Sequence, residues 1–170
     1  EPRERATFDA GEIAVVLSHY DLGVVESITE FPRGSRRSPK VGIVAERGKF
    51  LLKRRPASRA QPDRVRLIHR VQLHLAAAGF PLAPLAPTRD GNRTFVQLRD
   101  RVYELFEFIP GEGYDPTPAA ATESGRMLAL FHRLVRDMPL RYEPPIGHYH
   151  DSDRVRALLA QIAETLPDFA

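Results

Sequence analysis

The sequence predicts an α+β fold, in which a five-stranded antiparallel sheet with one inserted helix is followed by a group of helices. Short segments between residues 24 and 109 alternate apolar and polar residues, as strands with one buried face do. A helical pattern, with apolar residues three and four positions apart, interrupts them after the third segment. Beyond residue 110 the apolar spacing is helical. We therefore expect two domains, residues 1–109 with the sheet and residues 110–170 with helices.

The composition is that of a soluble globular protein. With 170 residues and 42% hydrophobic content, the chain can bury one core and begin a second. It shows neither a cleavable leader nor an apolar run near the roughly 20 residues of a membrane span. The absence of cysteine excludes disulfides and thiolate metal sites, and it fits a reducing compartment. We predict a cytoplasmic protein without a membrane partner.

Basic residues gather in one part of the chain, although the net charge is only +3. Such a cluster predicts an anionic partner for this region. A GC-rich coding sequence, which favours arginine, explains most of these residues equally well. The cluster consists of Arg33, Arg36, Arg37, Lys40, Lys49, Lys53, Arg54, Arg55, Arg59, Arg64 and Arg66.

The first helix and strand follow from local signals. Apolar residues recur at helical spacing from Ile13 to Tyr20, and Gly23 offers a C-terminal stop. Alternating apolar and polar residues then predict a strand over residues 24–31. The prolines of residues 32–39 cannot continue it, so this segment is expected to be a turn.

A hairpin and the inserted helix come next. Strands are expected over residues 41–45 and 50–53, joined by a turn at residues 46–49. Pro62 opens the helix and Gly79 closes it. The residues that share its apolar face are Val65, Ile68, Val71, Gln72 and Leu75.

The last two strands and the helical part complete the pattern. The turn at residues 89–92 precedes a strand over residues 94–98, and a second turn leads to a strand over residues 102–109. Residues 110–113 break that strand and begin a linker. Two helices are expected beyond it. The first covers residues 119–135, and its buried face is expected to hold Met127, Leu128, Phe131, Leu134 and Val135. The second is capped by Asp151 or Ser152 and extends to Leu166.

Two features of the first domain suit a polyphosphate. The turn with Gly34 and Ser35 is small enough for backbone N–H groups to approach an anion. Lys53 and Leu51 point to the opposite side of their strand from Phe50 and Leu52, so Lys53 can project towards a cleft under that turn. The alternatives are an ordinary surface turn and an edge lysine that prevents aggregation.

The order of several segments strengthens this interpretation. They are GKFLLKRRP, LIHRVQLHLAAAGFPLAPLAPTRDGNRTFVQL, RVYELFEFIPGEGYD and ATESGRMLALFHRLV. Together they resemble the amino-terminal half of the aminoglycoside phosphotransferase and homoserine/choline kinase-like superfamily, with the closest likeness to its spore-coat kinase-like branch. The resemblance covers roughly residues 10–165. It implies a protein-kinase-like small lobe followed by the first helices of a helical large lobe.

The resemblance also implies an activity and a site. Such proteins transfer the γ-phosphoryl group of ATP to a substrate hydroxyl, here that of a small molecule. Lys53 would then meet the phosphates beside Gly34 and Ser35, with Phe106 at the back of the adenine pocket and the Glu107 carbonyl and Ile109 amide at the adenine edge. We expect no catalytic residue and no metal ligand within this chain, and we expect the Mg²⁺ ligands beyond residue 170. The chain alone should therefore be inactive.

One departure from the family pattern concerns Lys53. Family members pair this lysine with a glutamate on the following helix, but residues 64–89 contain no acidic residue, and the inward positions hold His69 and Gln72. Either Asp63 completes the site, or the lysine is held by a neutral hydrogen bond, or phosphoryl transfer has decayed. The identity of the phosphoryl acceptor and the oligomeric state cannot be inferred from the sequence.

Other interpretations compete with the kinase. A basic module for nucleic acid or another anion would use Arg33, Arg36, Arg37 and Lys40, but the aromatic residues do not form an obvious stacking set, so nucleic acid is not expected as a partner. A kinase-like scaffold without catalysis is a further possibility. The histidines and aspartate of residues 148–151 resemble metal ligands but lack a third ligand, and a polar loop before a helix cap explains them better. His132, where relatives commonly carry a histidine, is more simply a packed one.

Overall fold

The computed structural model describes residues 5–139 and 153–165. The chain divides into two compact units, Glu1–Leu140 and Arg141–Ala170. The described residues of the second unit form helix α4 (Asp153–Thr165), which confirms the expected last helix. Its expected cap and the histidines near residue 148 lie outside the described residues. No helix within the two described ranges combines the length and the apolarity needed to cross a membrane.

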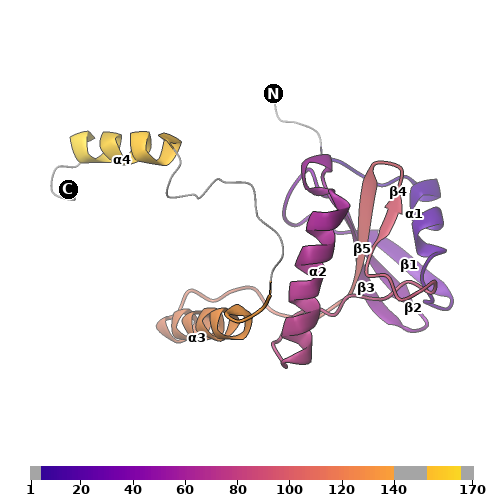
Figure 1. Cartoon of the computed structure of the whole chain (residues 1–170). Helices are drawn as coiled ribbons and strands as arrows, with labels where there is room; N and C mark the ends of the chain where they lie inside the picture. Colours follow the sequence, from indigo (N-terminus) through magenta and orange to yellow (C-terminus); the bar gives the residue numbers. More distant parts are fainter. Residues whose placement is uncertain (1–4, 140–152, 166–170) are drawn as a thin grey trace. The chain divides into compact units, whose positions relative to one another are not determined.

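The first unit is built on a five-stranded antiparallel sheet, as predicted (Figure 1). The order of strands across the sheet is β1-β2-β3-β5-β4. The predicted ends agree with the observed ones to within three residues. The strands are β1 (Val25–Glu30), β2 (Lys40–Ala45), β3 (Gly48–Arg54), β4 (Val96–Leu98) and β5 (Arg101–Glu107).

Helix α1 (Ala10–Leu17) covers one face of this sheet. Asp9 caps it by accepting a 2.8 Å hydrogen bond from the N–H of Glu12. Because side chains alternate along a strand, every second residue of the central strands meets this helix in the main core. The core includes Val16, Tyr20, Leu22, Val41, Ile43, Phe50, Leu52, Tyr103 and Leu105.

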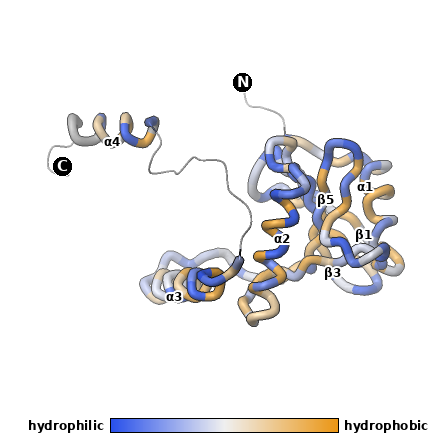
Figure 2. Tube along the Cα trace, viewed as in Figure 1, coloured by the Kyte–Doolittle hydropathy of each residue, from blue (hydrophilic) through white to orange (hydrophobic). Residues whose placement is uncertain are grey.

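Helix α2 (Pro62–Ala77) is inserted between β3 and β4 and lies beside the opposite face (Figure 1). A short 3₁₀ turn, η1 (Ala57–Arg59), leads into it. Figure 2 shows hydrophobic and hydrophilic bands alternating along α2, as expected for an amphipathic helix. Of the predicted apolar face, Val65 and Leu75 are buried, but the third buried residue of α2 is His69.

Helix α3 (Pro118–Val135) packs only partly against the rest of the unit. The carbonyl of Leu134 accepts a 2.8 Å hydrogen bond from His74 of α2, and the ring of Phe131 lies 6.0 Å from that of Phe80. The predicted burial of its apolar face is wrong for the described residues, since no residue of α3 is buried and Leu128 is 56% exposed. The contacts of α3 with α2 and with the segment after it that are described above come from Phe131 and Leu134, in the C-terminal part of α3.

Candidate functional site

Lys53 lies on the face of the sheet that α2 partly covers. Phe50 and Leu52 join the core with α1, whereas Lys53 points the other way, which confirms the predicted alternation along β3. Its side chain is 30% exposed, so the ammonium group borders solvent. Lys53 is therefore a cation fixed on a packed strand and accessible from outside.

Glu104 of β5 is the acidic partner of Lys53. The two residues lie opposite each other in the β3–β5 ladder, and Glu104 Oε2 is 3.4 Å from Lys53 Nζ. The side chain of Glu104 is fully buried, and its Oε1 accepts hydrogen bonds of 2.6 Å from both Arg55 and His69. Burial alone would raise the pKa of Glu104, but these hydrogen bonds and the charge of Lys53 outweigh it and hold the pKa at about 2. The carboxylate is therefore ionised at neutral pH.

His69 links α2 to this carboxylate. An ionised carboxylate can only accept hydrogen bonds, so the proton on Nε2 of His69 must point to Glu104. The other ring nitrogen, Nδ1, lies 2.7 Å from the hydroxyl of Thr94. In the neutral ring Nδ1 accepts from that hydroxyl, and both nitrogens are satisfied although His69 is only 1% exposed.

Lys53 thus has an acidic partner among the described residues, and neither Asp63 nor a neutral hydrogen bond, two of the three alternatives left open by the sequence, describes it. The partner comes from β5 and not from the following helix, and His69 occupies the inward position of that helix. Asp63 does not complete the site, since its side chain is 88% exposed and pairs with Arg66 at 2.5 Å. One signal in the sequence could have indicated this: Glu104 lies between Val102 and Phe106 on a side of the strand that is otherwise apolar.

A second lysine and the β1–β2 loop stand beside Lys53. Lys40 lies opposite Lys53 in the β2–β3 ladder, and its ammonium donates to the carbonyls of Arg33 at 3.0 Å and Ser38 at 3.4 Å. Partial burial lowers the pKa of Lys40, as does the charge of neighbouring Lys53. Gly34 has a φ of +83°, and a Cβ there would lie 3.0 Å from Lys40 Nζ. The loop therefore closes over Lys40 in a conformation that glycine favours.

The same loop leaves several donors unpaired. Within the described part of the chain, the backbone N–H groups of residues 33–36 make no hydrogen bond. Ser35 organises the turn, because its carbonyl accepts from the N–H of Ser38 and its hydroxyl from the N–H of Arg37, both at 3.3 Å. A run of free backbone N–H groups beside two lysines is a suitable environment for an anion.

The predicted adenine side of the site follows β5. The ring of Phe106 lies 6.0 Å from Lys53 Nζ on the same face of the sheet. The N–H of Glu107 donates to the carbonyl of Pro84 at 2.9 Å, whereas the N–H of Ile109 has no hydrogen-bond partner among the described residues. Phe108 and Phe31 meet edge to face at 6.3 Å. None of these observations tests adenine binding, which stays a prediction.

The remaining candidates are not brought to the site. Arg54 faces α1, where it pairs with Glu12 at 2.6 Å. The interpretation of His132 as a packed histidine is wrong, since His132 is exposed on α3, where its ring contacts that of Phe131. Within residues 5–139 and 153–165 there is no group of three side chains that could hold a metal ion.

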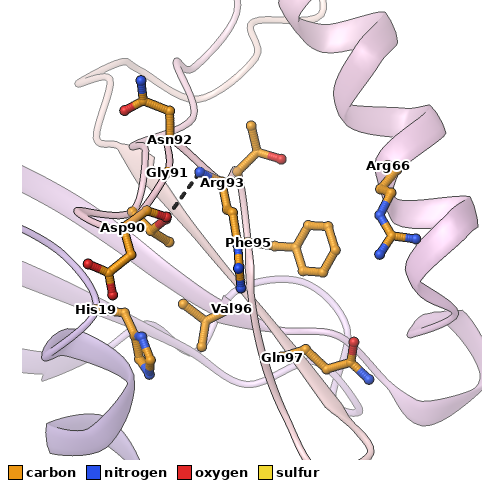
Figure 3. A pocket seen from close by; sticks show the side chains of 11 residues that line it. His19, Arg66, Asp90, Gly91, Asn92, Arg93, Phe95, Val96 and Gln97 are labelled. Carbon is orange, nitrogen blue, oxygen red and sulfur yellow. Dashed lines mark hydrogen bonds between the residues drawn. The ribbon is translucent and has the colours of Figure 1, made fainter.

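A surface cavity of about 720 Å³ lies away from these residues (Figure 3). It is lined by the segment before β4, by the start of β4, by His19 after α1 and by Arg66 of α2. His19, Asp90 and Arg93 stand on one side of it and Arg66 on the other, across Phe95. Lys53 and Glu104 do not line it. It is therefore separate from the candidate site, although Thr94 in its wall contacts His69.

Known proteins resemble this chain both in sequence and in fold. The family model described as the phosphotransferase enzyme family matches residues 27–170. A homoserine kinase of Phenylobacterium zucineum (strain HLK1) is 26% identical over 174 residues, which cover 94% of this chain and 52% of that protein.

Two solved structures share the fold. An aminoglycoside phosphotransferase from Alicyclobacillus acidocaldarius matches 85% of this chain and 40% of its own with a TM-score of 0.66 and 20% identity. An amicoumacin kinase in complex with AMP-PNP and Ca²⁺ matches 89% of this chain and 48% of its own with a TM-score of 0.65 and 11% identity. The closer likeness to spore-coat kinases stays a prediction.

This chain spans about half the length of the relatives that it matches. The family match covers most of its residues, and the sheet, the inserted helix and Lys53 all lie within or beside the matched range. The chain belongs to the phosphotransferase enzyme family.

Proposed function

We propose that this chain is the ATP-binding part of a small-molecule kinase, which transfers the γ-phosphoryl group of ATP to a substrate hydroxyl in the cytoplasm. The observation that carries the proposal is the ion pair between Lys53 and the buried Glu104, with Lys40 and a loop of unpaired N–H groups beside it. Cations that outnumber carboxylates at a partly exposed site attract a polyphosphate. Residues 1–109 then form the nucleotide lobe, and residues 110–170 begin the helical lobe.

The described residues fit ATP in two respects. Lys53, with Gly34 and Ser35 in the loop, offers charge and donors to the phosphates. Leu51 and Phe106, paired in the β3–β5 ladder, offer an apolar surface to the base next to the free N–H of Ile109. Among the described residues there is no group of three histidine or acidic side chains that could hold a metal ion. We propose that the ligands of Mg²⁺ and the catalytic base lie outside this chain.

The reaction itself is a displacement at phosphorus. The oxygen of the acceptor hydroxyl forms a bond to the γ-phosphorus, the bond to the β–γ bridging oxygen breaks, and ADP leaves. The hydroxyl proton passes to the base. Catalysis of such a transfer depends mainly on positioning the reactants and on neutralising the charge of the phosphates. A fixed cation such as Lys53 is therefore expected to account for a large part of the rate enhancement.

The test uses the full-length protein. Transfer from [γ-³²P]ATP is measured to a panel of alcohols that includes homoserine, choline and aminoglycosides, with Lys53→Ala beside the wild type. We expect one class of alcohol to be phosphorylated, and we expect the Lys53→Ala rate to fall at least a hundredfold. An unchanged rate would remove Lys53 from the site. Salt-sensitive oligonucleotide binding with no phosphorylated alcohol would favour the anion-binding module instead.

A further inference from the structure

The two oxygens of Glu104 have different surroundings. Oε1 accepts the hydrogen bonds of Arg55 and His69, whereas Oε2 is buried and has no hydrogen-bond partner among the described residues. The nearest cation to Oε2 is the ammonium of Lys53, at 3.4 Å. A buried carboxylate oxygen is costly when it is left unpaired, so Oε2 attracts that ammonium.

We propose that Glu104 positions Lys53 for phosphoryl transfer, and that His69 holds the Glu104 carboxylate in the orientation that this requires. The inference rests on the proposed function. It assigns the anchor of the lysine to β5, whereas helix α2 contributes a histidine. Both are positioning residues, since each acts through Lys53.

His69 is suited to this role because its ring cannot turn freely. Its Nε2 donates to Glu104, its Nδ1 contacts the hydroxyl of Thr94, and its ring lies edge to face with Phe95 at 5.8 Å. A ring fixed on three sides fixes the carboxylate that it contacts. The position of α2 is thereby coupled to that of Lys53.

Electrostatics predicts which kinetic constant depends on Glu104. Replacing it with glutamine removes a negative charge but leaves Lys53, Lys40 and Arg55, so the site still attracts the phosphates of ATP. Lys53, however, loses the group that fixes its ammonium. The rate of the chemical step should therefore fall while the KM for ATP stays nearly the same.

The experiment measures kcat and KM for MgATP in the full-length protein, with the panel alcohol that is phosphorylated fastest. Glu104→Gln should lower kcat at least tenfold and change KM less than threefold. The matched control is Glu12→Gln, because Glu12 is also a buried, ion-paired carboxylate but lies on the opposite face of the sheet. It should keep kcat within twofold. When Lys53 is already replaced by alanine, adding Glu104→Gln should lower kcat by less than a further twofold.

Each outcome decides one question. If the panel gives no product, or if Lys53→Ala is fully active, the proposed function fails and this inference fails with it. If Lys53→Ala loses activity but Glu104→Gln keeps kcat within twofold, only this inference is overturned. The same holds if the reductions in kcat caused by Lys53→Ala and by Glu104→Gln multiply in the double variant. If Glu104→Gln does not fold, variants of His69 provide the test. His69→Gln keeps an N–H donor and should retain most of kcat, whereas His69→Leu should lose about tenfold, and equal rates would overturn the inference.

Discussion

Acid should destabilise this fold through Glu104. The pKa of Glu104 is lowered from 4.5 to about 2 in the folded chain. A carboxyl group whose pKa is lower in the folded state binds its proton more readily in the unfolded state. Its contribution to the free energy of unfolding is therefore complete above a pH of about 4.5, and it is lost as the pH falls towards 2.

The size of this contribution follows from the shift. A lowering of roughly two and a half pKa units corresponds to about 3 kcal/mol, since one unit is about 1.4 kcal/mol. Glutamine at position 104 imitates the protonated acid. Glu104→Gln should therefore lower the free energy of unfolding by about 3 kcal/mol at pH 7, and the difference from the wild type should close as the pH approaches 2.

The assay is urea unfolding followed by circular dichroism at several pH values between 7 and 2, for the wild type and for Glu104→Gln. Glu123→Gln serves as the control, because Glu123 is an exposed residue that pairs with Arg126 on the surface of α3. Its urea midpoint should follow that of the wild type. The reasoning would be refuted if the free energies of unfolding of the wild type and of Glu104→Gln differed by the same amount over the whole pH range. It would also be refuted if Glu104→Gln lowered the free energy of unfolding at pH 7 no more than the control does.

Two further predictions concern the opposite face and the loop. Glu12→Ala should lower the free energy of unfolding, measured in urea, by about 3 kcal/mol, because it leaves the largely buried Arg54 and Tyr103 without their acceptor. Asp21→Ala, which removes an exposed ion pair, should lower it by less than about 0.5 kcal/mol. Equal losses would contradict this. Gly34→Ala should weaken MgATP binding severalfold in isothermal titration, since its Cβ would meet a lysine of the site. Gly91→Ala has a similar backbone strain in open space and should bind MgATP normally.

The elements that could be predicted are those with local causes. The turn at residues 46–49 and the end of the inserted helix at Gly79 follow from the residues at those positions, and the structure has both. The side on which Lys53 projects is likewise a property of one strand, because alternation along β3 needs no knowledge of its neighbours.

The partner of Lys53 could not be predicted in the same way. Glu104 lies 51 positions further along the chain, and it meets Lys53 only because β5 pairs with β3 in one particular register. A shift of that register by one residue would move Glu104 to the other face. The family pattern directed attention to the helix, where helical spacing identified His69 as inward but could not reveal what it contacts.

The run Lys53-Arg54-Arg55 shows how the fold selects one cation out of three. Because successive side chains of a strand alternate, Arg54 turns to α1 and is neutralised by Glu12, while its two neighbours turn to Glu104. Arg55 is only 9% exposed and Arg54 only 14%, whereas Lys53 is 30% exposed. Arg55 also makes the short hydrogen bond to Glu104 and Lys53 the longer contact. On each face of the sheet one carboxylate, Glu12 or Glu104, thus forms a short ion pair with one arginine. Of the three cations, Lys53 is the one that can reach a phosphate without first breaking a short ion pair.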